Sequence, residues 1–170
     1  MEYTSAEAAK LLRKLHENRD ALIEKERRSA GFVAAVGEDI EDVRPEYDYR
    51  KTQDELAQIE QKIRTVKHAI NQFNTGTVVQ DFGMTVDQIL VYIPQLTARK
   101  NKLIGMAARL PKERCGAAGF GAKAIIEYRY ANYDIAAAEA DLAAVTEELA
   151  RVQTALDVVN NTEVMEITFD

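Results

Sequence analysis

The sequence predicts a mainly α fold of two pseudo-repeated antiparallel helical hairpins, a coiled-coil-like bundle of four long helices with short β strands at the hairpin ends. The first observation is an internal repeat, in which Tyr47-Asp48 matches Tyr133-Asp134 at an offset of 86 residues. The second is the spacing of the apolar residues that follow, which step by 3 and 4 in both copies, as in a coiled-coil seam. The matched positions are Leu56, Ile59, Ile63, Val66, Ile70 and Phe73 in the first copy, and Leu142, Val145, Leu149, Val152, Leu156 and Val159 in the second.

The first helix of each copy matches as well, at an offset of 81 residues, so that Thr4 and Glu7 correspond to Thr85 and Gln88. This spacing is typical of a capping box, in which each side chain bonds the other residue's free backbone amide. Both copies are therefore expected to begin with a helix that is capped in the same way.

The two helices of the first copy have clear limits. The first is expected from Thr4 to about Arg28, whose last turn is basic and suits the negative end of the helix dipole. The second is expected to start at the N-cap Asp48 and to run to about Phe73.

The second copy repeats this order. Its first helix is expected from Thr85 to near Leu110, with a kink at Pro94, because proline removes a backbone hydrogen bond and clashes with the preceding turn. Its second helix is expected to begin at the N-cap Asp134 and to run to about Asn160.

Short strands are expected outside the helices. Residues 31–36 are apolar and bracketed by glycines, and residues 124–130 are rich in branched and aromatic side chains. We expect these two segments to pair with each other, and 77–80 to pair with 164–168, either within the chain or between subunits.

Size and composition limit the class of protein. The 170 residues are expected to form a single domain over 1–170, with a first hairpin over 1–80 and a second over 81–170. Cys115 is the only cysteine, so no intramolecular disulfide forms. No segment approaches the roughly 18 apolar residues of a membrane span, and no secretory signal is recognisable at the start. A cytoplasmic protein without membrane contact is expected.

The net charge of −6 is unevenly distributed. Residues 99–132 carry eight bases and two acids, whereas 133–170 carry nine acids and one base, and 38–60 carry nine acids and three bases. This asymmetry indicates charge complementarity across a bundle or between subunits, with a nucleic-acid surface as the alternative.

Part of the sequence resembles a known family. The segments 70–74 and 83–85 with Leu90, and then 127–130 followed by 134–137, resemble the septicolysin-like family of small uncharacterised bacterial helical-hairpin proteins. The resemblance spans most of the chain and implies a helical-hairpin fold. A bacterial or prophage origin is expected separately, because it fits a small self-assembling protein. It implies no activity and no catalytic residue, and the apolar first connector and the C-terminal strand depart from it.

Two groups of residues are candidates for binding. Aromatic and basic residues at the connector–helix junctions are a possible ligand or interface site, because such rings stack on a base or a ligand or pack a small sheet. These are Tyr47, Tyr49, Tyr128, Tyr130, Tyr133, Arg44 and Arg129. The possible nucleic-acid contacts are Arg99, Lys100, Lys102, Arg109, Lys112 and Arg114.

Other motifs give no site. The glycine-rich segment 116–123 lacks the hydroxyl residue and the preceding strand of a phosphate loop. His16 and His68 have no convergent ligand set, and the acidic run 38–42 lacks the spacing of a calcium loop. Cys115 has basic neighbours but no histidine nearby in the sequence. No catalytic residue, cofactor or metal is therefore predicted.

Three functions follow in order of support. The first is a non-enzymatic structural or interaction protein, a homo-oligomer that assembles through coiled-coil helices and end strands, with room for another protein partner. The second is a nucleic-acid-binding helical arm that uses the basic third helix. The third is a small-ligand binder at the tyrosine-rich connector end.

Overall fold

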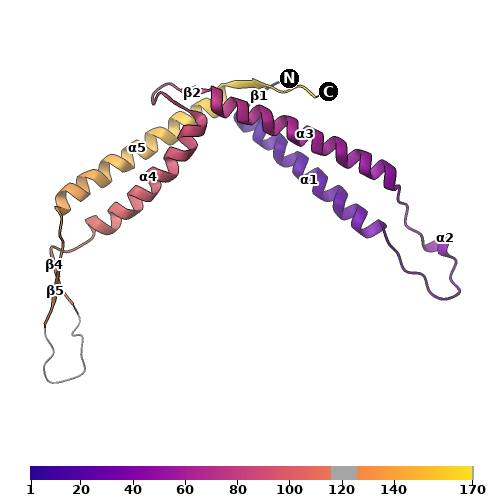
Figure 1. Cartoon of the computed structure of the whole chain (residues 1–170), viewed down its shortest axis with the longest axis horizontal. Coiled ribbons are helices and arrows are strands. Elements are labelled where there is room, and N and C mark those ends of the chain that lie inside the picture. Colours follow the sequence, from indigo (N-terminus) through magenta and orange to yellow (C-terminus); the bar gives the residue numbers. More distant parts are fainter. Residues whose placement is uncertain (116–125, 170) are drawn as a thin grey trace. The chain divides into compact units, whose positions relative to one another are not determined.

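The computed structural model describes residues 1–115 and 126–169, and it is mainly helical with short antiparallel strands, as the sequence predicts (Figure 1). The chain divides into two compact units, Met1–Thr77 with Val158–Asp170, and Val78–Asp157. Each unit contains a helical hairpin. The interpretation as a single domain with pseudo-repeats that meet at residue 80 stays a prediction.

In the first unit, α1 (Ser5–Ser29) packs against α3 (Tyr49–Gly76). The Thr4 backbone amide donates to Glu7 Oε2 at 2.9 Å and the Glu7 amide donates to Thr4 Oγ1 at 3.2 Å, which confirms the capping box. Asp48 Oδ1 accepts from the Lys51 amide at 3.0 Å and caps α3 as predicted. Both helices extend a few residues beyond their predicted ends, because fraying limits are poorly encoded in sequence.

The interface between α1 and α3 follows the predicted seam. Val66 and Phe73 of α3 are buried, and Leu56, Ile59, Ile63 and Ile70 are half-buried. On α1 one row of buried or half-buried residues again steps by 4 and 3, and two members of this row are charged. They are Ala8, Leu12, Leu15, Arg19, Leu22 and Glu26.

The ends of the chain meet in a two-stranded sheet. β1 (Glu2–Thr4) pairs antiparallel with β6 (Val164–Glu166), with Tyr3 opposite Met165. The ladder continues to Ile167, whose amide donates to the Met1 carbonyl at 2.9 Å. The terminal strand was therefore predicted correctly, but its expected pairing with 77–80 is wrong within the chain. Three residues before a helix carry no strand pattern, so β1 was not recognised as the partner.

In the second unit, α4 (Val86–Ala107) lies beside α5 (Ile135–Thr162), whose last residues belong to the first unit (Figure 1). The hydroxyl of Tyr92 on α4 donates to Glu148 Oε1 on α5. The α5 seam is as predicted, since Leu142 and Val159 are half-buried and the four positions between them are buried. The α4 seam repeats that of α1 at the offset of 81 and comprises Ile89, Ile93, Leu96, Lys100, Leu103 and Ala107.

The caps of the second unit also agree with the sequence. The Thr85 amide donates to Gln88 Oε1 at 2.9 Å, while the Thr85 hydroxyl bonds the Asp87 carboxylate. Asp134 Oδ1 accepts from the Ala136 amide at 2.9 Å, which confirms its role at the start of α5. Pro94 lies inside α4, which continues through it.

The strands of the second unit pair with near neighbours. β2 (Val78–Val79) pairs with β3 (Met84–Thr85) through a turn in which Gly83 has φ +61°. β4 (Lys112–Arg114) pairs with β5 (Tyr128–Tyr130). Closing a short loop costs less chain entropy than closing a long one, which favours these local pairs.

The predicted pairing of 31–36 with 124–130 is therefore wrong within the chain. Of the second segment, the described part forms β5 with β4 as its partner, and 124–125 lie outside the described residues. The first segment forms no strand, because Ala35 and Glu38 bond each other in a local turn. A short helix that was not predicted, α2 (Ile40–Val43), follows this turn and is capped by Asp39.

Candidate functional site at the hairpin ends

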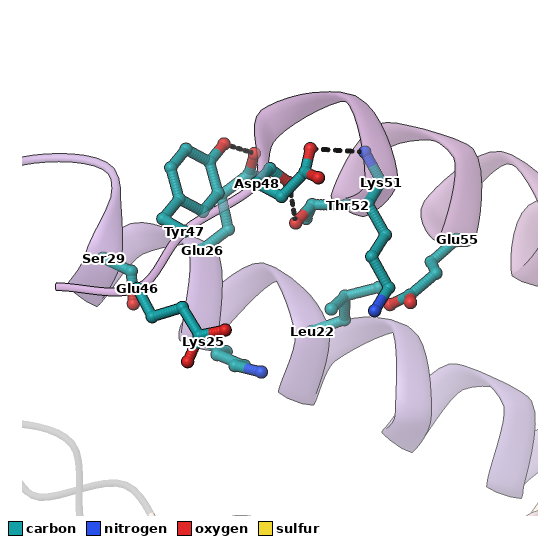
Figure 2. Close-up of a pocket in the computed structure, with 10 residues that line it drawn as sticks. All are labelled: Leu22, Lys25, Glu26, Ser29, Glu46, Tyr47, Asp48, Lys51, Thr52 and Glu55. Atoms are coloured by element: carbon teal, nitrogen blue, oxygen red, sulfur yellow. Dashed lines mark hydrogen bonds between the residues drawn. The ribbon is translucent and has the colours of Figure 1, made fainter.

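Tyr47 joins the two helices of the first hairpin (Figure 2). Its hydroxyl donates to Glu26 Oε1 at 2.6 Å, and Gln53 Nε2 on α3 donates to the same oxygen at 2.7 Å. The hydrogen bond to the Glu26 carboxylate raises the pKa of Tyr47 to about 12, and burial adds to the shift. A phenol with so high a pKa stays protonated at neutral pH, so Tyr47 acts as a clasp between α1 and α3.

A cavity of about 260 Å³ lies beside this clasp. Figure 2 shows Lys51 reaching past Leu22 toward Glu55, and Glu46 directed toward Lys25. Cations and carboxylates thus line the cavity together. The arrangement suits a solvated end of a hairpin.

The connector between α1 and α3, residues 30–48, exposes apolar side chains. Val33 and Val36 are almost fully exposed, and Phe32 and Ile40 are about half exposed. Arg44 Nη2 lies 2.7 Å from Glu41 Oε1, and the Arg44 guanidinium carbon lies 5.7 Å from the centre of the Phe32 ring. We call residues 30–48 the acidic connector, because 38–48 carry six acids and one base.

Tyr133 is the counterpart of Tyr47 in the second hairpin. Its hydroxyl donates to the backbone carbonyl of Met106 on α4 at 2.7 Å. The repeat places Ala107 where the first hairpin has Glu26, so no side-chain acceptor stands there and a neighbouring carbonyl takes its role. Both repeat-equivalent tyrosines therefore bond back to the end of the preceding long helix.

The pair β4–β5 carries a basic and aromatic face. Lys112 is opposite Tyr130 and Arg114 is opposite Tyr128, so the alternation of strands puts all four on one side. The Lys112 Nζ lies 4.1 Å from the centre of the Tyr128 ring and 5.5 Å from that of Tyr130. Both tyrosines and both cations are exposed. We call this set of four residues the ribbon face.

The predicted tyrosine group does not gather at one end within either unit. Tyr47, with exposed Tyr49 at the start of α3, belongs to the first unit, while Tyr128, Tyr130 and Tyr133 belong to the second. Arg44 contacts Phe32, and Arg129 is exposed opposite Glu113, away from the ribbon face.

The predicted basic group is divided as well. On α4, Arg99 and Lys102 are exposed, but Lys100 is half-buried at a seam position. Arg109 is exposed just beyond the helix. Lys112 and Arg114 lie on β4, where they join the tyrosines. The six cations therefore do not form one continuous helical face.

Sequence analysis did not identify Glu26 or the stacking of Lys112 on Tyr128. The signal for Glu26 is its seam position on α1, where a charged residue at a half-buried site needs partners. The signal for the ribbon face is the matching alternation of Lys112 with Arg114 and of Tyr128 with Tyr130.

The remaining motifs form no site in the described ranges 1–115 and 126–169. No group of three or more His, Cys, Asp or Glu residues there could hold a metal ion. His16 is half-buried, His68 is exposed, and Cys115 is half-buried at the end of β4. All of the glycine-rich segment 116–123, which was considered as a phosphate loop, lies outside the described residues.

Comparison with known proteins finds a similar fold and gives no function. The scan against protein-family models matches no family, and no curated protein matches. The chain is similar to a solved structure described as a functionally unknown conserved protein from Corynebacterium diphtheriae. The two are 15% identical with a TM-score of 0.61, over 98% of this chain and 100% of that one. At this identity the likeness shows a shared fold, and the septicolysin-like resemblance stays a prediction.

Within the described part of the chain, none of the helices combines the length and the apolar character that crossing a membrane requires.

Proposed function

We propose that this chain is a non-enzymatic interaction protein that assembles with copies of itself in the cytoplasm. The observation that carries the proposal is an exposed apolar row on α4. Leu90 and Ile104 lie seven residues on either side of Thr97, so the three share one line along the helix, and each of the two apolar side chains is 48% exposed. Val91 beside them is also exposed. We call Leu90, Thr97 and Ile104 the outer row.

The composition of the second hairpin supports this assignment. α4 and α5 carry 4 and 6 charged residues, whereas α1 and α3 carry 12 and 8 over similar lengths. A helix with few charges outside its seam is typical of one that is covered by a further element. Protein–protein contacts form at contiguous exposed apolar surface, and Leu90, Val91 and Ile104 are the large exposed apolar side chains that α4 offers to such a contact.

The nucleic-acid alternative has weaker support. A helical arm that binds phosphates needs a row of cations on one face. Lys100 lies at the seam, however, and not on the exposed side of the helix with Arg99 and Lys102. The sequence pI of about 5.1 also opposes non-specific binding to a polyanion. The small-ligand alternative has only the mixed-charge cavity beside Tyr47 in its favour.

The test is the molar mass of the protein in solution, measured by light scattering from low to high micromolar concentration. Self-assembly gives a mass that rises above the 19.1 kDa of one chain as concentration increases. A constant mass of one chain over the whole range would overturn the proposal.

A further inference from the structure

Two exposed surfaces remain without a partner in the described residues, and their charges are opposite. The first is the acidic connector, with Val33, Val36 and Ile40 exposed beside its carboxylates. The second is the ribbon face, with two exposed tyrosines between two cations. Each surface combines large apolar groups with charge of one sign.

We infer that the acidic connector of one copy binds the ribbon face of a second copy. The two surfaces match in both apolar and charged groups. Apolar side chains of the connector can pack on the tyrosine rings of the ribbon face, and carboxylates of the connector can pair with Lys112 and Arg114. Tyrosine and arginine are also the residue types that concentrate binding energy at interfaces. The inference rests on the proposed self-assembly and names one of its contacts.

The groups available for pairing are identifiable in the connector. Glu38 closes the turn with Ala35, Asp39 caps α2, and Glu41 pairs with Arg44. Asp42 and Glu46 are exposed, and the carboxylate of neither has a hydrogen bond or ion pair among the described residues. These two carboxylates can therefore meet a partner's cations without loss of an internal bond.

A nucleic acid fits the ribbon face less well. Aromatic rings with cations do bind single strands, but the ribbon face supplies two cations, Lys112 and Arg114, and the carboxylates of Glu113 and Glu127 on the other side of the same two strands lower the local positive charge. The described residues from Arg109 to Arg114 and from Ile126 to Tyr130 carry four bases and two acids. The net charge of these two segments is therefore +2, on a chain whose total charge is −6. So small a positive charge favours an acidic peptide over a polyanion as the partner.

The contact has a defined symmetry. Connector and ribbon are different surfaces, so their contact is heterologous, and repeated head-to-tail it gives a ring or an open filament. A variant altered only on the connector and a variant altered only on the ribbon can therefore form one intact contact when they are mixed. The inference is testable by reversing the charges on each surface separately.

The experiment uses sedimentation velocity with two charge-reversed variants, Lys112→Glu with Arg114→Glu on the ribbon, and Asp42→Lys with Glu46→Lys on the connector. We expect each variant alone to associate about tenfold more weakly than wild type, or less, because like charges then face each other. An equimolar mixture of the two variants restores association toward the wild-type level.

Two controls keep the outcome readable. Lys62→Glu with Lys67→Glu on exposed positions of α3 makes the same charge change, and it neither weakens association nor rescues the connector variant. Lys112→Gln with Arg114→Gln removes the cations without adding acids, and we expect it to weaken association less than the charge reversal does. This milder variant keeps the test decisive if the charge-reversed variant does not fold.

Three results would overturn the inference. If wild type associates and the charge variants associate equally well, the contact is wrong while the proposed self-assembly stands. If wild type is monomeric at all concentrations, the self-assembly itself is wrong. If wild type binds a single-stranded oligonucleotide in a salt-sensitive way that the ribbon variant loses, with self-association unchanged, the ribbon face is a nucleic-acid site.

Discussion

The hairpin of α1 with α3 and the hairpin of α4 with α5 have matching interiors and different exteriors. Ala8, Leu15 and Leu22 of α1 correspond to Ile89, Leu96 and Leu103 of α4 at the same offset. Even the half-buried cation recurs, as Arg19 in one seam and Lys100 in the other. A repeated polar residue in an otherwise apolar seam is a known means of fixing register.

The outward residues differ at the same positions. Leu90 and Val91 of α4 stand where α1 has Ala9 and Lys10, and Pro94 stands where it has Arg13. The interiors therefore share what one hairpin needs to form, while the exterior of the second hairpin has fewer charges and more apolar side chains than that of the first. This contrast separates residues that stabilise a hairpin from residues available for contact with another molecule.

The largest expected effect tests the shared interior. Val66 and Val152 are repeat-equivalent and both 0% exposed. Replacing either by alanine should lower the free energy of unfolding by about 2–3 kcal/mol, from lost burial and the cavity left behind. Urea denaturation measures this loss for each variant.

The matched controls are Lys67→Ala and Gln153→Ala, the exposed neighbours at the same offset, which should change stability by less than about 0.5 kcal/mol. Clearly unequal losses at Val66 and Val152 would break the equivalence of the two seams.

A smaller effect is expected at the caps. Thr4→Ala removes the side-chain half of its capping box, in which Thr4 Oγ1 accepts from the Glu7 amide, and should cost about 1 kcal/mol. Thr85→Ala should cost about half as much, because the Thr85 hydroxyl bonds the Asp87 carboxylate. The bonds from the backbone amides of these two positions to Glu7 and Gln88 survive in both variants. Thermal unfolding of both alanine variants, with Thr→Ser at each position as the control, measures the difference. Equal costs would show that the two caps are energetically the same.

An effect of about the same size as that of the caps is expected at the two tyrosine clasps. Tyr133→Phe removes one bond to a backbone carbonyl and should cost about 0.5–1.5 kcal/mol.

Tyr47→Phe should instead show a loss that depends on alkaline pH. The pKa of Tyr47 is raised to about 12 in the folded state by the Glu26 carboxylate, against an unperturbed value of 10.0. A raised pKa stabilises the fold fully below the unfolded value and loses this contribution as pH rises toward the folded value. The stability gap between wild type and Tyr47→Phe should therefore narrow between about pH 10 and 12. A gap that is constant over this window would mean that Tyr47 does not bond Glu26.

The helices and seams were predictable because their signals are local. The 3-4 spacing after Asp48 and Asp134, and the caps at Thr4 and Thr85, each act within one helix. Strand pairing was not predictable in the same way, because two-residue and three-residue strands have little pattern of their own. β1 paired with β6 and β2 with β3 because the adjoining helices and short turns bring them together.

The candidate sites show the same limit. The tyrosines and cations were recognisable as residue types, but their grouping depends on the register of β4 with β5, which places Lys112 against Tyr128 and Tyr130. Glu26 was missed because its partner Tyr47 is 21 residues away in the sequence, and the sequence does not show how the connector between them folds back.

The measurement that most directly tests the contrast between the hairpins compares two paired substitutions by light scattering. Leu90→Lys with Ile104→Lys charges the outer row, and Ala9→Lys with Ile23→Lys makes the equivalent change on α1. If the second hairpin carries an assembly surface on its outer row, the first pair lowers the molar mass at a given concentration toward the 19.1 kDa of one chain, and the second pair leaves it at the wild-type value. A wild-type molar mass with the first pair, or a molar mass that falls only with the second, would contradict the account.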